Sequence, residues 1–354
     1  MNKIELLKAE KDGLKIKDDI HRFVKEGWES ISEEDIHRLK WYGLFLRNPT
    51  PGFFMLRVRI PNGFSSSHQV RVLASIAETY GNGVIDITTR QQLQLRHLKI
   101  ENIPQVFDLI EEVGLTTSQT GMDNVRNIMG CPVAGLNPKE RVDAYSLVKD
   151  LNEHIIDNPE FSNLPRKFNI TLSGCPDDCV HAETQDLALV PAIEEKGGNT
   201  VYGFNILVGG KLGSGGYRIA TPLNVFLCPE EVVEVCSALI LLYRDHGSRD
   251  IRSKNRLAFL IEDWGEEKFR SALEESVGRS LTLAGVDLRG NEKSEHIGAY
   301  RQKQDFMNYV GLKIPVGRIQ ADKLKGLAQL SEKYGNEEIR FSHSNSLVIP
   351  NIPD

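Results

Sequence analysis

Residues 58–98 and 312–352 carry the same module twice, in ungapped register 254 positions apart. Eleven of the 41 aligned positions are identical, and most of the others stay within a residue class. The clearest identities pair each of the following residues with the residue 254 positions later: Ile60, Pro61, Gly63, Glu78, Tyr80, Gly81, Asn82, Ile85 and Leu93. Because an internal repeat decides the architecture of a chain, we expect two related modules in a two-fold repeated protein.

The first module has the pattern of a ferredoxin-like sandwich. Phe53–Ile60, Val84–Thr88 and Gln92–Leu98 alternate in hydrophobicity as strands do. A helix is expected from a cap at Ser65 or Ser66 to the Tyr80-Gly81 stop, and a second one over Val106–Val113. The resulting order, β-α-β-β-α, is the ferredoxin-like one and lacks at most one edge strand.

The chain is expected to be α+β, with a larger mixed domain between the two modules. We divide it into an N-terminal extension, a first ferredoxin-like half-domain, a reductase-type domain, a linker and an incomplete second half-domain. Their expected ranges are 1–50, 51–118, 119–285, 286–306 and 307–354.

The second module reaches Asp354 without the helix that should cover its sheet. Uncovered apolar sheet surface is rare in globular chains, so we expect a truncated module and an incomplete piece of a longer protein. The residues expected to include unusually exposed ones are Leu312, Ile314, Ile339, Leu347 and Ile349.

Composition excludes several classes of protein. With 40% hydrophobic and 26% charged residues, the chain has an ordinary globular composition. A net charge of −6 argues against a general nucleic-acid or membrane-surface binder. Neither an apolar signal core nor a run of 18 apolar residues is present, so we expect a cytoplasmic protein without a membrane partner. Five cysteines in so long a chain do not indicate a disulfide scaffold.

Basic side chains recur beside residues that restrict the backbone. Arg90 lies in a turn between two strands, Arg126 precedes Gly130-Cys131-Pro132, and Arg166 follows Pro165. Residues 244–256 hold four arginines and a lysine. Guanidinium groups on rigid strand ends suit an anionic ligand, although each cluster taken alone also fits a solvated face or a structural ion pair.

Longer motifs resemble one family in residues, order and spacing. The chain resembles the siroheme-dependent assimilatory nitrite and sulfite reductases from about Trp28 to Asp354. The segments that carry the resemblance are Gly121–Asn127, Asn163–Asn169, Asp186–Ala192, Gly203–Gly210 and His296–Gln304. That family is built as a pseudo-two-fold pair of ferredoxin-like modules and larger α+β domains, in agreement with the repeat.

The resemblance implies a six-electron reduction of nitrite to ammonia, or of sulfite to sulfide, on siroheme coupled to a [4Fe–4S] cluster. Siroheme carries eight carboxylates, and the substrate is an anion, so cations must offset both. Arg90 and Arg166 are the expected substrate-side cations. The expected siroheme-binding residues are Asn124, Arg126, Arg252, Lys254, Gln302 and Lys303.

One loop departs from the family pattern. After Gly209-Gly210 the assimilatory enzymes place a lysine, followed two residues on by asparagine in the nitrite type or lysine in the sulfite type. The ungapped positions here are Gly215 and Tyr217. Lys211 and Arg218 are the cations of this segment, and we expect one of them, preferably Arg218, to act in catalysis. The choice between nitrite and sulfite stays open.

The cysteines favour a repeat-related counterpart of the cluster motif. Cys175 and Cys179 have C-x₃-C spacing, but the family's actual ligands lie in the second repeat, beyond this chain. A [4Fe–4S] cluster needs four thiolates, whereas Cys131, Cys175 and Cys179 number three and lack a C-x₅-C pair. We therefore expect no metal ligand here and place the cluster ligands in a C-terminal part, with Cys131, Cys175 and Cys179 as the less favoured alternative ligands. Cys228 and Cys236 are interpreted as core thiols.

Four interpretations remain. In the leading interpretation, the chain is part of a longer or split nitrite reductase that uses ferredoxin or a similar electron donor. If the enzyme is split, a companion chain supplies the C-terminal part. Sulfite reduction is the alternative, and the oxygen-dependent cobalamin-precursor synthases share the architecture. The fourth is a catalytically incomplete fragment or a siroheme-binding remnant.

Overall fold

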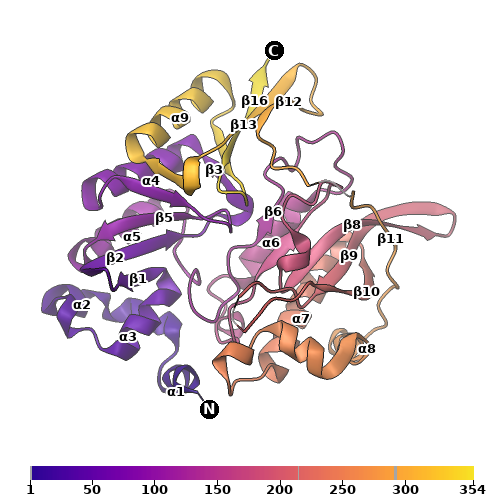
Figure 1. Ribbon diagram of the computed structural model, residues 1–354, viewed down its shortest axis with the longest axis horizontal. Helices are drawn as coiled ribbons and strands as arrows, with labels where there is room; N and C mark the ends of the chain where they lie inside the picture. Colours follow the sequence, from indigo (N-terminus) through magenta and orange to yellow (C-terminus); the bar gives the residue numbers. More distant parts are fainter. Residues whose placement is uncertain (1, 214, 291–292) are drawn as a thin grey trace. The chain divides into compact units, whose positions relative to one another are not determined.

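A computed structural model describes residues 2–213, 215–290 and 293–354; Met1, Ser214, Asn291 and Glu292 lie outside the described residues. The chain divides into two compact units (Figure 1). Unit 1 comprises Met1–Lys8 and Asp123–Ser294, and unit 2 comprises Ala9–Met122 and Glu295–Asp354. Ser214, which belongs to the predicted loop of Lys211 and Arg218, is outside the described part, as are two residues of the predicted linker.

Unit 2 begins with short helices. Helix α1 (Lys3–Glu10) crosses the boundary between the units, because its residues up to Lys8 belong to unit 1. Helices α2 (Ile20–Glu26) and α3 (Glu33–Arg38) follow it in unit 2. The Ser32 hydroxyl accepts a hydrogen bond from the backbone N–H of Asp35 and so caps α3. Ile20 and Phe23 of α2 are buried in the core of unit 2, which explains why this polar segment folds onto the module that follows it.

The first sheet of unit 2 contains five antiparallel strands in the order β1-β2-β5-β4-β14. Its helices are α4 (Ser67–Tyr80) and α5 (Ile103–Glu112), and a capping box between Ser66 and Gln69 starts α4. The strands are β1 (Leu44–Arg47), β2 (Thr50–Val58), β4 (Val84–Ile87), β5 (Leu93–Leu98) and β14 (Arg318–Gln320). The predicted β-α-β-β-α order is confirmed. The sheet has β1 as the edge strand beside β2, and at its other edge it gains β14, from the second copy of the repeat, beside β4.

The second sheet of unit 2 is built in the same way, in the order β12-β13-β16-β15-β3. Helix α9 (Ala321–Tyr334) accompanies it. The strands are β3 (Phe64–Ser66), β12 (Gly298–Arg301), β13 (Met307–Leu312), β15 (Glu338–Phe341) and β16 (Leu347–Pro353). Here the edge strand next to β15 comes from the first copy.

The two copies therefore exchange edge strands reciprocally, and the exchange repeats at the 254-residue offset. The backbone N–H of Ser67 donates to the carbonyl oxygen of Glu337 at 2.7 Å. Its counterpart 254 residues on, Ala321, donates to Gly83 at 2.8 Å. Because both sheets gain a fifth strand in this way, β4 and β15 are no longer edges.

Side chains repeat the exchange. The Gln91 amide donates to the Phe341 carbonyl at 3.0 Å, and the Asn345 amide, 254 residues after Gln91, donates to Ile87 at 2.7 Å. Helices α4 and α9 pack together. Across this contact lie two ion pairs related by the same offset, Arg71 with Glu332 and Lys325 with Glu78.

The predicted exposure of the second module was wrong. Ile339 and Leu347 are fully buried, and Ile314 and Ile349 are 8% and 4% exposed. Leu312 is half-buried against the same core. The physical reason is that the two modules share one hydrophobic core, so the apolar positions of the second module face the first.

Unit 1 is built on a sheet in the order β10-β9-β8-β7-β6, with β11 beside β8. The pairs β6·β7 and β7·β8 are parallel, and the rest are antiparallel. The strands are β6 (Met129–Gly130), β7 (Ile170–Leu172), β8 (Leu187–Lys196), β9 (Asn199–Val208), β10 (Thr221–Leu227) and β11 (Val286–Asp287).

Three long helices complete unit 1: α6 (Ala144–Ile155), α7 (Val232–His246) and α8 (Leu257–Val277). Asp143 caps α6, and α8 is interrupted at Gly265, whose φ is 75°. Their apolar faces join the strands in a second hydrophobic core. Among the helices of the described ranges, none is both long and apolar enough to cross a membrane.

Gly63 tests the strand exchange. It has a φ of +73°, and a Cβ there would overlap the carbonyl oxygen of Phe341. Gly83 has a φ of +72° with nothing within 4 Å of an added Cβ. Both alanine variants incur the left-handed backbone cost of roughly 1–2 kcal/mol. We expect Gly63→Ala to lower the free energy of unfolding, measured with urea, by about 1–3 kcal/mol more than Gly83→Ala does. The reason is that the added Cβ at position 63 also pushes the two modules apart. Equal losses would contradict the packing described.

Candidate functional site

The candidate site residues fall into separate groups in the two units. In unit 1, the buried carboxylate of Asp123 forms ion pairs with several basic side chains. Arg252 donates from both Nη atoms to its two oxygens, each at 2.8 Å. The Lys8 ammonium lies at 3.4 Å and the Arg166 guanidinium at 3.8 Å from Asp123. Arg252, expected to bind siroheme, thus holds a buried carboxylate of its own chain with both terminal nitrogens.

A second buried pair lies at the start of β8. Arg256 donates to Asp186 from Nε at 2.8 Å and from Nη2 at 2.7 Å. Asp186 also accepts the backbone N–H of Asn169 at 2.8 Å. Burial, helped by the Asp186 carboxylate, raises the pKa of Tyr243 well above its usual value, and its hydroxyl donates to Asn255. The motif beginning at Asp186 is therefore a structural anchor that connects β8 to the segment before α8.

Positive charge exceeds negative charge in this part of unit 1. Five cations join three carboxylates through ion pairs: Lys8, Arg166, Arg249, Arg252 and Arg256 with Glu5, Asp123 and Asp186. Such a surplus favours the binding of an anion.

Arg166 has spare bonding capacity in this cluster. Within the described part of the chain, its buried Nε has no hydrogen-bond partner. Burial lowers the pKa of Arg166, the Arg252 guanidinium adds to that effect, and Asp123 opposes it. An unpaired buried donor costs free energy that a carboxylate or oxyanion would recover. This is the geometry expected of an anion-binding arginine.

Asn124 and Arg126 are fixed beside Arg166 through the backbone. The N–H of Arg126 donates to the Phe168 carbonyl at 2.9 Å, and the N–H of Phe168 donates to the Asn124 carbonyl at 3.0 Å. Both side chains are buried. Lys254, by contrast, is exposed at the end of the short helix that carries Arg252.

Lys211 and Arg218 are brought together, but each has internal partners. Their backbones exchange two hydrogen bonds, at 2.9 and 3.0 Å. The Lys211 ammonium donates to Gly215 at 2.9 Å. Arg218 donates to the Ala258 carbonyl and pairs with Glu262 and Glu266 at 3.5 and 3.4 Å. Two glutamates offset the charge of Arg218, so a structural role explains it without a substrate.

In unit 2, Arg90 lies in the turn between β4 and β5. The Thr88 hydroxyl accepts the backbone N–H groups of Arg90 at 3.2 Å and Gln92 at 3.1 Å, which fixes this turn. Burial lowers the pKa of Arg57 to about 9, and the positive charge of Arg90 contributes. Two guanidinium groups held near one another favour an anion between them.

Gln302 and Lys303, both predicted to bind a cofactor, have different surroundings. Gln302 is buried: its amide nitrogen donates to the Asn351 side chain at 2.8 Å, and its oxygen accepts the Asn351 N–H at 2.7 Å. These bonds attach the segment before β13 to β16. Lys303 is exposed.

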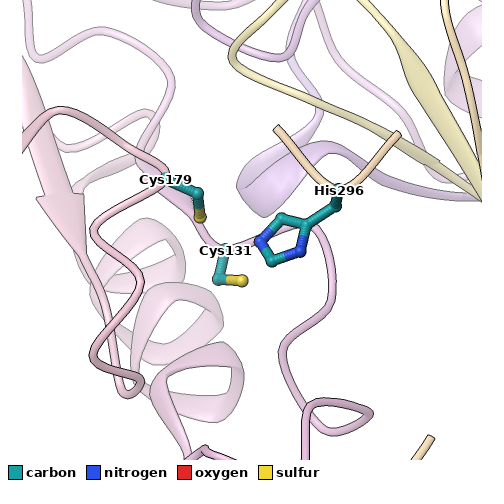
Figure 2. A group of neighbouring side chains, drawn as sticks. All are labelled: Cys131, Cys179 and His296. Carbon is teal, nitrogen blue, oxygen red and sulfur yellow. The ribbon is translucent and has the colours of Figure 1, made fainter. Parts of the chain in front are cut away.

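Three buried thiols gather in unit 1. Cys131 and Cys175 have their sulfur atoms 3.9 Å apart, and those of Cys131 and Cys179 lie within 4.8 Å. Figure 2 shows Cys131 and Cys179 on neighbouring loops; His296, drawn with them, belongs to unit 2. The expectation that this chain holds no group of thiol ligands is not supported.

From the sequence, these three cysteines are candidate ligands that their number and spacing disfavour. Sequence reasoning did not bring them together as one group, because 44 residues separate Cys131 from Cys175. The parallel pairing of β6 with β7 closes that distance, since each cysteine follows the carboxyl end of its strand. The signal that could have found it is the placement of Gly-Cys-Pro after both short strands, at Gly130 and at Gly174.

The thiols are protonated when they bind nothing. The hydrogen bond with Cys131 and burial raise the pKa of Cys175 far above the usual range. For Cys131, the hydrogen bond with Cys175 lowers the pKa, but that with Cys179 and burial outweigh it. Cys236 in α7 behaves as the predicted core thiol: burial raises its pKa to about 12. Cys228 is half-buried.

Matches to two family models over most of the chain give the class of protein. Residues 121–281 match the family described as nitrite and sulphite reductase 4Fe-4S domain. Residues 47–113 and 300–354 match the nitrite/sulfite reductase ferredoxin-like half domain. The chain belongs to the nitrite and sulfite reductase family of oxidoreductases, so both the predicted family and the predicted fold class are confirmed.

Individual relatives are ferredoxin–nitrite reductases. That of Leptolyngbya laminosa is 47% identical, over 97% of this chain and 68% of its own length. That of Synechococcus elongatus is 44% identical, over 100% and 70%. The assimilatory ferredoxin-dependent nitrite reductase of Haloferax mediterranei is 37% identical, over 99% and 65%.

Solved structures agree with this assignment. The NirA protein of Mycobacterium tuberculosis superimposes with a TM-score of 0.93 at 31% identity, covering 99% of this chain and 66% of that one. Dissimilatory sulfite reductase I gives a TM-score of 0.53 at 14% identity, which shows a shared fold alone.

The buried Asp186–Arg256 pair offers a stability test. Arg256→Met leaves the Asp186 carboxylate buried without its cation, so we expect a loss of about 3–5 kcal/mol in the free energy of unfolding, measured with urea. Lys149→Met, at an exposed helical pair with Glu153, should change it by less than about 0.5 kcal/mol. Similar effects of the two substitutions would show that the buried pair does not anchor β8.

Proposed function

We propose that this chain acts in the six-electron reduction of nitrite to ammonia, with siroheme and a [4Fe–4S] cluster as cofactors and a ferredoxin-type protein as electron donor. The observation that carries the proposal is the cation surplus around Asp123, where Arg166 keeps an unpaired buried donor. The names of the relatives favour nitrite over sulfite. Because the chain spans 68% and 70% of the first two relatives, this activity is proposed for the chain together with whatever completes it.

The residues of unit 1 fit a polycarboxylate cofactor. Siroheme presents eight carboxylates, and the buried Asn124 and Arg126 stand beside the Arg166 cluster through backbone bonds to Phe168. Lys254 extends from the same region into solvent, where it can meet a peripheral carboxylate. When bound, siroheme and the cluster supply the redox-active metal and the route for electrons.

The protein's own contribution is electrostatic and protonic. Nitrite takes up six electrons and eight protons to give ammonium and two water molecules, so the site must first hold an anion and then deliver protons. Arg166 offers an Nε donor that no acceptor among the described residues uses, which suits it to orient that anion. We propose the same anion-orienting role for Arg90. In unit 2 its positive charge is close enough to Arg57 to help lower the pKa of Arg57.

Arg252, Arg218 and Gln302 are not needed in this proposal. Their partners are Asp123, the two glutamates of α8 and Asn351 respectively. Each of them connects backbone segments of its own unit. Sulfite reduction and an incomplete, siroheme-binding chain stay as the alternatives to this activity. A companion chain and a cytoplasmic location stay as predictions.

Turnover separates these alternatives. The chain, together with the part that completes it, is produced in cells supplied with siroheme precursors, and the visible spectrum is recorded with and without nitrite. We expect siroheme absorption bands that nitrite perturbs, and ammonium formed at six reduced-viologen equivalents per nitrite. A colourless protein, or one whose bands respond to sulfite and not to nitrite, would overturn the proposal.

Arg166 provides the matched variant. Arg166→Gln should lower kcat/KM for nitrite by at least about tenfold, because removal of one donor to a developing anion costs that much or more. Arg289→Gln, which removes a guanidinium paired with Asp287 on the same unit, should leave the rate unchanged. If both variants retain full activity with siroheme bound, Arg166 does not contact the substrate.

A further inference from the structure

The structure assigns to Cys131, Cys175 and Cys179 a binding site for one zinc ion, held by three thiolates. This inference goes beyond the proposed reduction and does not depend on it. The three cysteines lie in one unit, are each at most 7% exposed, and are the described sulfur atoms that approach one another. Soft thiolates are the preferred ligands of zinc in proteins.

The separations of the Cys131 sulfur from the other two sulfurs fit a single ion. Zinc binds thiolate sulfur at about 2.3 Å in tetrahedral geometry, which places two ligand sulfurs roughly 3.8 Å apart. Cys131 and Cys175 are at 3.9 Å, and Cys131 and Cys179 are within 4.8 Å. In a four-iron cluster each thiolate binds a different iron, so the sulfurs must stand farther apart than these do.

The backbone that carries the thiols is fixed without a metal. The carbonyl of Cys131 accepts the N–H of Ala134 at 3.1 Å, and the Asp178 carboxylate accepts the N–H of Ala182 at 3.1 Å. Gly174, just before Cys175, accepts the N–H of Arg141 at 2.8 Å, and a Cβ there would overlap the Val142 carbonyl. Such preorganisation favours metal binding.

The alternative occupants explain less of the geometry. A disulfide between Cys131 and Cys175 would use two sulfurs and give no reason for the third beside them. Ordinary core thiols lie among apolar side chains, as Cys236 of α7 does in the hydrophobic core of unit 1. The trio instead includes a polar neighbour, the Ser173 hydroxyl at 3.9 Å from the Cys175 sulfur. Three thiolates leave the fourth zinc position to an exchangeable ligand such as water.

Metal analysis of the whole chain tests the site. The 354-residue protein, purified without a metal-binding tag and dialysed against metal-free buffer, should retain about one zinc ion per chain by mass spectrometry. Zinc X-ray absorption should give three sulfur neighbours at about 2.3 Å. Cobalt replacement should produce the intense visible bands of a tetrahedral thiolate site.

Serine variants provide the controls. Cys175→Ser should lower retained zinc at least tenfold, and Cys179→Ser serves if Cys175→Ser does not fold. Cys236→Ser, at a buried thiol outside the trio, should retain zinc. Protein that binds no zinc while its thiols are reduced would overturn the inference. So would a Cys131–Cys175 disulfide in reducing buffer, or iron and acid-labile sulfide that disappear in Cys175→Ser. None of these readouts measures nitrite turnover, so this inference and the proposed function fail independently.

Discussion

The reciprocal exchange of β3 and β14 is the constraint on which unit 2 depends. Each strand has three residues, too few to stabilise a sheet alone, yet each closes the open edge of the other module's sheet. The bonds of Ser67 and Ala321, the amides of Gln91 and Asn345, and the ion pairs across α4 and α9 all recur at the same 254-residue offset. A two-fold repeat is thereby turned into one body with one core.

This exchange also determines how a proposed functional residue is held. Arg90 occupies a turn in the first module, and its neighbour Gln91 has a φ of 58° and bonds to Phe341 in the second. The turn is therefore supported from both copies. In unit 1 the corresponding support is ionic: the Asp123 and Asp186 pairs hold the chain around Arg166 and leave its Nε available. In both units, side-chain hydrogen bonds to other segments hold the chain next to the group that is proposed to meet the anion.

Much of the fold could be predicted from the sequence, because the repeat and its turn residues define the elements of each module. The strand exchange could not be predicted, because Phe64–Ser66 and Arg318–Gln320 are too short to show a strand pattern. The 254-residue offset of the repeat also does not say which sheet an edge strand joins. That omission is why Ile339 and Leu347 were expected at the surface. Arg166 and Arg90 were identified from motifs. The partners of Arg252, Arg218 and Gln302, and the meeting of Cys131 with Cys175, depend on contacts between distant segments that no local spacing encodes.

Native-state hydrogen exchange measures the shared core directly. Amides of Val84–Ile87 and Glu338–Phe341 lie beside the exchanged strands in the two sheets. If the modules form one cooperative body, these amides should exchange with the same opening free energy, equal within about 1 kcal/mol to that of global unfolding of unit 2. An opening free energy for Glu338–Phe341 that is several kcal/mol lower than that for Val84–Ile87 would contradict the account, because it would show that the second module opens while the first stays folded.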